Sequence, residues 1–427
     1  MAKYILKSMG CKSNQFEGNI IEEKLIDCGF QKVQELKDAD YFILNSCTVT
    51  HKSDSETLYL LRNAKHINPH IKTVLTGCLA QVDKDELIKL EYVDYIYGND
   101  DKFNLAEHLL NNESCLVTDI MSLKTFNPQI LKDTNKTRIS LKIQDGCDNR
   151  CSYCIIPFAR GKSRSADEKF IIEEINKYAA EGFNEVIITG IHIGQWGIDK
   201  GKKLLDLLKL MEGTSIHRYR LGSLNPTEIP LEVLEFLKSS EKFCPHFHLS
   251  LQSACDKTLR AMNRFYKTET YLEQIEYIVE NFNKPFIGCD IIAGFVGETE
   301  EDFQTTVDNL KRSKLTKIHT FPYSIRSGTK AKDMAGHLPA SIKEERAAII
   351  KQISANKFSQ FLELNIGDTR EVLIEKRPDK KYGMLKGVTD NYLNVIIEDE
   401  PKSELFNSIH NVKIERIENG KCFGKLV

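Results

Sequence analysis

Short apolar runs alternate with amphipathic helical stretches along most of this chain of 427 residues. In residues 1–111, strand-like runs at residues 4–6, 41–44 and 73–75 each precede a helical stretch, at residues 15–28, 53–67 and 84–90. Strands and helices that alternate with short links predict a doubly wound parallel sheet, flavodoxin-like in outline. Such sheets bind their ligands at the carboxyl ends of the strands.

A second α/β region follows a polar segment, residues 112–137, that the composition predicts to be a linker. Between residues 138 and 365, strand candidates alternate with helices at residues 139–143, 185–189, 218–221, 246–251, 287–293 and 317–321. Six such units are too few for a full eight-stranded barrel but fit a partial (β/α)6 barrel, again with its chemistry at the strand carboxyl ends. Residues 366–427 hold only short β-like runs, which predict a small C-terminal β-barrel.

Composition narrows the cellular setting. With 41% hydrophobic and 28% charged residues the chain is typical of a soluble protein, and no apolar run reaches the roughly 18 residues of a membrane span. The first residues lack the features of a secretory signal, so we expect a cytoplasmic protein that does not cross a membrane. Twelve cysteines in such a protein indicate metal or redox chemistry before disulfides.

Three cysteines, Cys147, Cys151 and Cys154, stand in a C-x3-C-x2-C pattern directly after a predicted strand. We call them the central triad. Three thiolates on one loop can hold three corners of an iron–sulfur cube and leave one iron open to a substrate. A structural zinc site is the alternative, but such sites use four ligands and typically pair a CxxC with a distant second pair, which this chain lacks.

Three further cysteines each follow a strand of the first region: Cys11, Cys47 and Cys78, the N-terminal triad. Neighbouring parallel strands lie about 4.8 Å apart, so loops at adjacent strand ends can bring three thiolates around one cluster. Gly10 and Gly77 would leave the backbone room beside it. The other cysteines are interpreted as small hydrophobic residues; they are Cys28, Cys115, Cys244, Cys255, Cys289 and Cys422.

The spacing of the central triad resembles that of the radical S-adenosylmethionine superfamily, and with both triads the chain resembles the radical methylthiotransferases along essentially its whole length. The motifs at residues 10–15, 45–50 and 144–160 resemble the branch that acts on N6-threonylcarbamoyladenosine in tRNA. Ser13 departs from that pattern, because the first motif often carries an apolar residue there. The resemblance implies an N-terminal methylthiotransferase domain (1–111), a radical domain (138–365) and an RNA-associated TRAM-like β-barrel (366–427).

The resemblance also implies an activity and its cofactors. Two 4Fe-4S clusters, one on each triad, and S-adenosyl-L-methionine would add a methylthio group to C2 of the modified adenosine next to the anticodon. This C–H bond offers no acidic proton to a side-chain base, so the cofactors carry the difficult chemistry and no catalytic side chain is assigned. The partners implied are the tRNA anticodon stem-loop and an electron donor protein, while the sulfur source stays open.

Four residues are candidates for contacts with S-adenosylmethionine. Tyr153, just before the last cysteine of the central triad, matches an aromatic position that packs near the adenine in the superfamily. Gly190 lies in a turn that meets the methionine amino group in superfamily members, although the acidic residue often found there is absent. Gln252 and Arg264 are further candidates near the fourth strand.

Charge gives a separate indication of an RNA partner. The net charge of −2 implies no global attraction to nucleic acid. Residues 132–166, however, carry eight Lys or Arg against three Asp, and Arg160, Lys162 and Arg164 are closely spaced there. They are candidates for holding phosphates or the anionic group of the substrate; a solvated charged loop is the alternative. The C-terminal module has 11 basic and 11 acidic residues, so its RNA role depends on the resemblance alone.

Two other functions stay open at this point. Within the enzyme class, the substrate could be N6-isopentenyladenosine in tRNA. From a different class, the chain could be a non-enzymatic iron–sulfur or zinc RNA-binding sensor, which would need the cysteines but no cleavage of S-adenosylmethionine.

Overall fold

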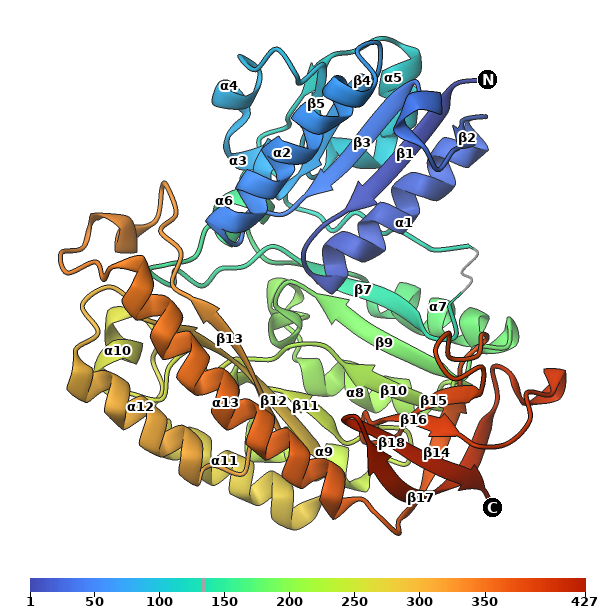
Figure 1. Cartoon of the computed structure of the whole chain (residues 1–427), viewed down its shortest axis with the longest axis vertical. Coiled ribbons are helices and arrows are strands. Elements are labelled where there is room, and N and C mark those ends of the chain that lie inside the picture. Colours follow the sequence, from blue (N-terminus) through green and yellow to red (C-terminus); the bar gives the residue numbers. More distant parts are fainter. Residues whose placement is uncertain (133–135) are drawn as a thin grey trace.

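The computed structural model of the chain describes residues 1–132 and 136–427. Three parts follow one another along the chain: an N-terminal α/β part, a central part of parallel strands with outer helices, and a C-terminal β-barrel beside the first strands of the central part (Figure 1). The mixed α/β architecture with its small closed barrel confirms the fold class that the sequence predicts.

The N-terminal part is a parallel sheet with strand order β2-β1-β3-β4-β5-β6. Its strands are β1 (Lys3–Ser8), β2 (Gln31–Lys32), β3 (Tyr41–Ser46), β4 (Lys72–Gly77), β5 (Tyr95–Tyr97) and β6 (Cys115–Leu116). β6 pairs with β5, so the segment predicted as a linker contributes an edge strand.

Helices cover both faces of this sheet. They are α1 (Lys12–Asp27), α2 (His51–Ile67), α3 (Cys78–Val82), α4 (Lys84–Leu87) and α5 (Leu105–Leu110). Along β3, Ile43 packs with α1 and α5, whereas Phe42 and Leu44 pack with α2 and α3. This alternation follows from the two-residue period of a strand and explains why β3 is apolar on both faces.

The central part has six parallel strands, as predicted: β7 (Ile139–Asp145), β9 (Glu185–Gly190), β10 (Arg218–Leu221), β11 (His246–His248), β12 (Phe286–Ala293) and β13 (Lys317–Pro322). Isolated parallel bridges, Tyr219 with Phe243 and Leu224 with Leu249, join the β10 side to the β11 side. A short antiparallel strand, β8 (Arg164–Ser165), pairs with the end of β7. The strands therefore form an open, partial barrel.

Helices cover the outside of the partial barrel. They are α7 (Glu168–Ala180), α8 (Leu204–Glu212), α9 (Leu231–Ser239), α10 (Asp256–Ala261), α11 (Thr268–Asn281), α12 (Glu300–Arg312) and the long α13 (Ala340–Leu364). The short helix α6 (Ile156–Arg160) instead packs against α3 of the N-terminal part (Figure 1). The core of this part also takes in Phe16 and Ile20 from α1, so the first two parts share buried apolar contacts. No helix within the described residues is long and apolar enough to cross a membrane.

The C-terminal part is a closed barrel with strand order β14-β15-β16-β18-β17. Its strands are β14 (Thr369–Ile374), β15 (Leu385–Thr389), β16 (Asn394–Ile397), β17 (Ile409–Glu418) and β18 (Lys421–Leu426). A buried ionic cluster holds the C-terminal barrel against the central part: Glu185 accepts hydrogen bonds from Arg218 (2.7 Å) and Arg220 (2.8 Å). The same two arginines donate to the carbonyls of Val388 (2.9 Å) and Thr389 (2.6 Å).

Candidate active site

The N-terminal triad lies at the carboxyl ends of three adjacent strands. Cys11 follows β1, Cys47 follows β3 and Cys78 begins α3 directly after β4. The loops are in close contact: Gly10 has a φ of +83°, and a Cβ there would come within 2.6 Å of Cys47 Sγ. Only glycine fits this conformation and this space without strain.

The central triad lies on the loop between β7 and α6. Its three members are half-buried. Cys147 Sγ lies 3.4 Å from His192 Nδ1, and Arg264 Nη1 lies 3.5 Å from Cys151 Sγ. These contacts orient two of the three sulfur atoms from outside the loop.

Within each triad, burial and the neighbouring cysteines disfavour the ionised form of a thiol. Burial, and then Cys78, raise the pKa of Cys47 to about 12; burial, and then Cys151, raise the pKa of Cys154 to about 12. Several thiols gathered in this way become thiolates when a metal takes their protons. Among the described residues no three His, Cys, Asp or Glu side chains converge as the ligands of a single metal ion would.

Two neighbouring cavities connect the triads. The smaller cavity, about 340 Å³, is lined by Tyr153, Cys154, Gln252 and Cys11 among others. The larger cavity, about 640 Å³, extends from Cys11 and Gly190 to His246 and Tyr392. Cys11, Asp290 and Phe321 line both, so one cysteine of the N-terminal triad stands where the two cavities meet.

The four predicted cofactor residues occupy different places. Tyr153 and Gln252 line the smaller cavity beside Cys154, and Gln252 has a φ of +70°, which is uncommon outside glycine. Gly190 ends β9 in the wall of the larger cavity, where a Cβ would meet Gln144 O at 2.8 Å. Arg264 lines neither cavity; besides Cys151 it contacts Asn225 Oδ1 (2.5 Å).

The sequence did not single out His192, which is buried between the two sides of the central site. Its Nδ1 faces Cys147, and its Nε2 contacts Glu228 and Asn225. Burial acts to lower the pKa of His192, but hydrogen bonds to Cys147 and Glu228 raise it to about 10. The sequence offered one indication of a role for His192: it stands two residues after Gly190, in the turn at the end of a barrel strand.

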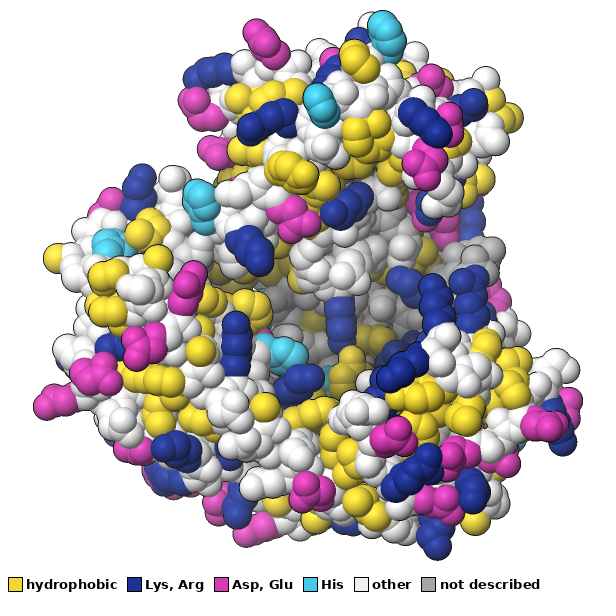
Figure 2. All heavy atoms as spheres, viewed as in Figure 1, with side chains coloured by type: hydrophobic (Ala, Val, Ile, Leu, Met, Phe, Trp, Pro, Cys, Tyr) yellow, Lys and Arg dark blue, Asp and Glu magenta, His cyan; other side chains and the backbone are white. Residues whose placement is uncertain are grey.

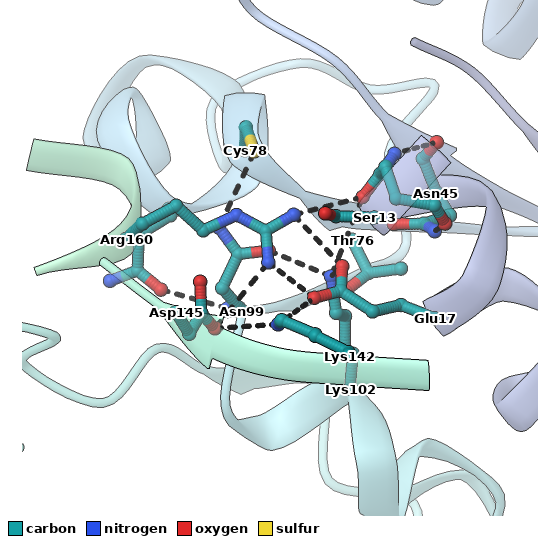
Figure 3. Close-up of polar contacts among 12 residues, drawn as sticks. Ser13, Glu17, Asn45, Thr76, Cys78, Asn99, Lys102, Lys142, Asp145 and Arg160 are labelled. Carbon is teal, nitrogen blue, oxygen red and sulfur yellow. Dashed lines mark hydrogen bonds and ion pairs between the residues drawn. The ribbon is translucent and has the colours of Figure 1, made fainter. Parts of the chain in front are cut away.

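A buried network of charges lies beneath the N-terminal triad and joins the first two parts of the chain (Figure 3). Glu17 of α1, fully buried, accepts from Lys102 (2.6 Å), Lys142 (2.5 Å) and Arg160 Nη2 (2.8 Å). Burial would raise the pKa of Glu17, but the three cations hold it well below its ordinary value. Asp145 adds a second carboxylate, 2.7 Å from Lys142.

The network also reaches the cysteines. Asn99 Nδ2 lies 3.7 Å from Cys78 Sγ and donates to the carbonyl of Ala159 at 2.7 Å. Arg160 lies beside Cys78 in Figure 3, and its charge acts on the thiols of Cys11, Cys47 and Cys78. A cation so placed offsets the negative charge of thiolate ligands.

This burial corrects one sequence-based hypothesis. Arg160 and Arg164 were candidates for holding RNA phosphates or the anionic group of the substrate, but they are only 1% and 4% exposed. Arg160 forms an ion pair with Glu17, and Arg164 Nη2 lies 3.8 Å from Asp145 and 3.1 Å from the carbonyl of Arg160. Of the three closely spaced basic residues, Lys162 alone is exposed. The carboxylates that pair with these two arginines stand elsewhere in the sequence, so the sequence alone did not reveal the ion pairs.

Basic residues gather instead beside the larger cavity. A groove of about 390 Å³ adjoins it and shares Lys12 and Tyr392 with it. Figure 2 shows the hollow where the three parts meet, with Lys and Arg side chains around it. The basic groove is lined by one carboxylate, Glu375, and by the cations Lys12, Lys136, Arg138, Lys376, Arg377 and Lys386.

Two family models match the chain. The Radical SAM superfamily model covers residues 141–310, and the model described as Uncharacterized protein family UPF0004 covers residues 3–98. The two matched segments contain the central and the N-terminal triad, respectively. Among solved structures, the radical S-adenosylmethionine methyltransferase TsrM of Kitasatospora setae, which has a bound [4Fe-4S] cluster, is similar with a TM-score of 0.56 and 13% identity over 78% of this chain and 77% of that one. This likeness shows the fold.

Relatives of known name are similar over nearly the whole chain. The threonylcarbamoyladenosine tRNA methylthiotransferase MtaB of Aquifex aeolicus is 38% identical over 403 residues, 92% of this chain and 96% of that protein. The protein of the same name from Thermotoga maritima is 32% identical over 96% and 94%. The tRNA-2-methylthio-N(6)-dimethylallyladenosine synthase of Thermodesulfovibrio yellowstonii is 31% identical over 99% and 98%.

Proposed function

The chain belongs to the radical S-adenosylmethionine methylthiotransferases, and from this membership we propose that it adds a methylthio group to C2 of N6-threonylcarbamoyladenosine next to the anticodon of tRNA. A radical S-adenosylmethionine enzyme of this family uses that cofactor and an iron–sulfur cluster. The second cluster, the C2 position and the anticodon site are part of the proposal. Family membership excludes the non-enzymatic sensor.

One observation carries the proposal: a cysteine of each triad lines the same cavity. Cys11 and Cys154 both face the smaller cavity, and Cys11 also faces the larger one. Methylthiolation requires a sulfur source and an activated carbon at one atom of the substrate. A substrate base at the junction of the two cavities would be within reach of groups held on both triads.

The donor set fits two clusters, each with one iron left without a protein ligand. Cys147, Cys151 and Cys154 would hold one, and the N-terminal triad the other. When bound, these groups and S-adenosylmethionine supply one-electron chemistry that activates C–H bonds and delivers sulfur. The chain itself binds and orients these groups and the substrate, and it encloses the space between them. Tyr153 and Gln252, which line the smaller cavity, are our candidates for contacts with S-adenosylmethionine; Gly190 stays a candidate in the larger cavity, whereas Arg264 is placed to orient Cys151.

The N-terminal part closes one side of the smaller cavity. The amide of His51 donates to Ser324 Oγ (2.8 Å), and Arg326 reaches Asp54 Oδ2 (2.5 Å) and Thr48 Oγ1 (2.5 Å). These contacts hold the loop after Cys47 against the loop after β13. A closed wall here excludes water from the space between the triads.

The basic groove supports an RNA substrate. Its six cations face one carboxylate, and it opens into the larger cavity through Lys12 and Tyr392. Phosphate contacts with Lys and Arg supply most sequence-independent affinity for nucleic acid. A stem-loop lying in the groove could place one base in the larger cavity, and a tRNA substrate also fits the cytoplasmic location that the sequence predicts. An electron donor protein is part of the proposal, and the sulfur source stays open.

The choice between the two modified adenosines depends on the walls of the larger cavity. Besides Cys11 and Tyr392, its charged and titratable lining consists of Lys12, Lys317 and three histidines, with one carboxylate, Asp290. Such a wall suits the anionic threonylcarbamoyl group, whereas an apolar isopentenyl group would leave these polar groups without partners. N6-isopentenyladenosine remains the second candidate, because a relative named for that kind of product is 31% identical over 99% of the chain.

Nucleoside mass spectrometry of tRNA from cells with and without the gene tests the proposal. We expect 2-methylthio-N6-threonylcarbamoyladenosine to disappear when the protein is absent, while N6-threonylcarbamoyladenosine accumulates. The matched experiment uses the anaerobically reconstituted enzyme on anticodon stem-loops that carry either modification. Preferential conversion of the isopentenyl stem-loop would overturn the proposed substrate, and no 5'-deoxyadenosine with either stem-loop would overturn the radical mechanism.

A further inference from the structure

All three parts of the chain meet at the ring of Tyr392, in the wall of the larger cavity. Lys12, from the N-terminal part, places its Nζ 5.7 Å from the ring centroid. Arg220 of β10 places its Cζ 5.2 Å from the same centroid, and the ring of His246 of β11 lies at 4.0 Å. A surface built from three separate parts of the fold exists only when the whole enzyme is assembled.

Three cations act on the ring of Tyr392 at this wall. Burial acts to raise the pKa of Tyr392, but Lys12, Arg138 and Arg220 lower it below its ordinary value. A buried phenol whose pKa is lowered and not raised indicates nearby cations that are incompletely neutralised. The same environment favours an oxyanion from a ligand.

The cations differ in how far the protein already neutralises them. Arg220 is paired with Glu185 at 2.8 Å, and Arg138 lies 3.9 Å from both Glu185 and Glu375. Lys12 has no carboxylate within 4.0 Å among the described residues, and its contact is the ring of Tyr392. Of the three cations that act on Tyr392, Lys12 is therefore the one that the protein neutralises least.

A buried polar atom without a partner lies at the same wall. His246 is 5% exposed, lines the larger cavity, and its Nδ1 has no hydrogen-bond partner among the described residues. Burial and the nearby cations, Arg220 and then Lys12, lower the pKa of His246 well below its ordinary value, so the ring is neutral. A neutral imidazole that lacks a partner is a donor or acceptor available to a ligand.

The backbone of Tyr392 has a strained conformation. Its φ is +72°, a left-handed conformation that a bulky residue adopts only where the surroundings impose it. Hydrogen bonds impose it here: the amide of Tyr392 donates to the carbonyl of Thr389 (3.1 Å), and the amide of Leu393 donates to Thr389 Oγ1 (2.7 Å). The β15–β16 turn thus presents this ring to the cavity.

We propose that Lys12 and Tyr392, with His246 beside them, recognise the carboxylate of the N6-threonylcarbamoyl group and thereby determine substrate specificity. Lys12 Nζ supplies the counter-charge and the Tyr392 hydroxyl a hydrogen bond. This inference rests on the proposed function. In adenine, C2 and the N6 substituent point in different directions from the six-membered ring. A base whose C2 faces Cys11 can therefore extend its N6 group along the larger cavity toward Tyr392.

The test uses two stem-loops, one carrying N6-threonylcarbamoyladenosine and one carrying its methyl ester, which is neutral and only one methyl group larger. The reconstituted full-length enzyme, Lys12→Met and Tyr392→Phe are compared by fluorescence anisotropy for binding and by single-turnover methylthiolation. Lys209→Met, on the exposed side of α8, is the charge-matched control.

For the acid we expect Lys12→Met to weaken binding at least about ten-fold and Tyr392→Phe by a smaller factor, since a charge-assisted contact is stronger than a neutral one. For the ester both variants should match the wild type within about two-fold, and Lys209→Met should match it on both stem-loops. Equal losses on acid and ester would overturn the inference and assign Lys12 to an RNA phosphate; no loss on either would also overturn it. Failure of the wild type to convert the acid, with conversion of an isopentenyl stem-loop, would instead reject the proposed function.

Discussion

Replacing Glu17 by glutamine should destabilise the docking of the first two parts of the chain more than any single change to its basic partners. Gln keeps the shape but removes the one charge on which Lys102, Lys142 and Arg160 converge. Removing one partner of a buried ion pair costs about 3–5 kcal/mol, because it leaves an uncompensated charge. With three cations left around the amide, and Asp145 within 4.0 Å of only two of them, we expect about 4 kcal/mol.

The contrasting variant is Lys102→Met. It leaves Glu17 with two cations, and its other losses are contacts to Asn99 Oδ1 (2.8 Å) and Asn14 Oδ1 (3.5 Å). Unsatisfied neutral groups cost about 1–3 kcal/mol, so this variant should be the milder of the two. Glu86→Gln is the control, since its ion pair with Lys89 is exposed and should contribute less than about 1 kcal/mol.

Urea denaturation under anaerobic conditions measures these differences through the fluorescence of Trp196. It is the single tryptophan of the chain, fully buried, in the same core as Phe16 of α1. The pKa of Glu17 is lowered in the folded protein, so its contribution is complete above the unfolded pKa of about 4.3 and is lost as the pH falls through the folded pKa. The reasoning fails if Glu17→Gln unfolds at the same urea concentration as Glu86→Gln, or if Lys102→Met costs as much as Glu17→Gln.

Three other predictions concern the clusters and the C-terminal barrel. Replacing all three cysteines of the central triad by alanine should leave about half of the roughly eight irons per chain; complete iron loss in the reconstituted variant would contradict two independent sites. Gly10→Ala should lose iron from the N-terminal triad, because a Cβ would lie 2.6 Å from Cys47 Sγ, whereas Gly29→Ala, at the same φ of +83° with no atom within 4 Å, should keep its iron. Glu185→Gln should speed amide hydrogen exchange in β15 at neutral pH by releasing the two arginines that hold it. Although burial acts to raise the pKa of Glu185, those arginines lower it to about 2. The wild type should therefore show the same faster exchange only as the pH falls from about 4.3 toward 2. Unchanged exchange in the variant would refute the role of this ion cluster.

The sequence was sufficient for the fold class and for the places where the six cysteines stand. Periodicity decides which segments become strands and helices, and a cysteine that directly follows a strand must lie at that strand's carboxyl end. Cys11, Cys47 and Cys78 follow β1, β3 and β4, which are neighbours in the sheet. The role of the six cysteines as cluster ligands stays a prediction, although both matched family segments contain them.

Tertiary structure alone decided the charge partners. Glu17 meets Lys102, Lys142 and Arg160 across 85, 125 and 143 residues of chain, so local sequence made Arg160 resemble a surface residue when it is buried. In the same way Lys12 stands next to a cysteine in sequence, but its position beside Tyr392 arises only because the first and last parts both dock on the partial barrel. Backbone pattern is set by neighbours along the chain, whereas the partner of a charge is set by which surfaces come together on folding.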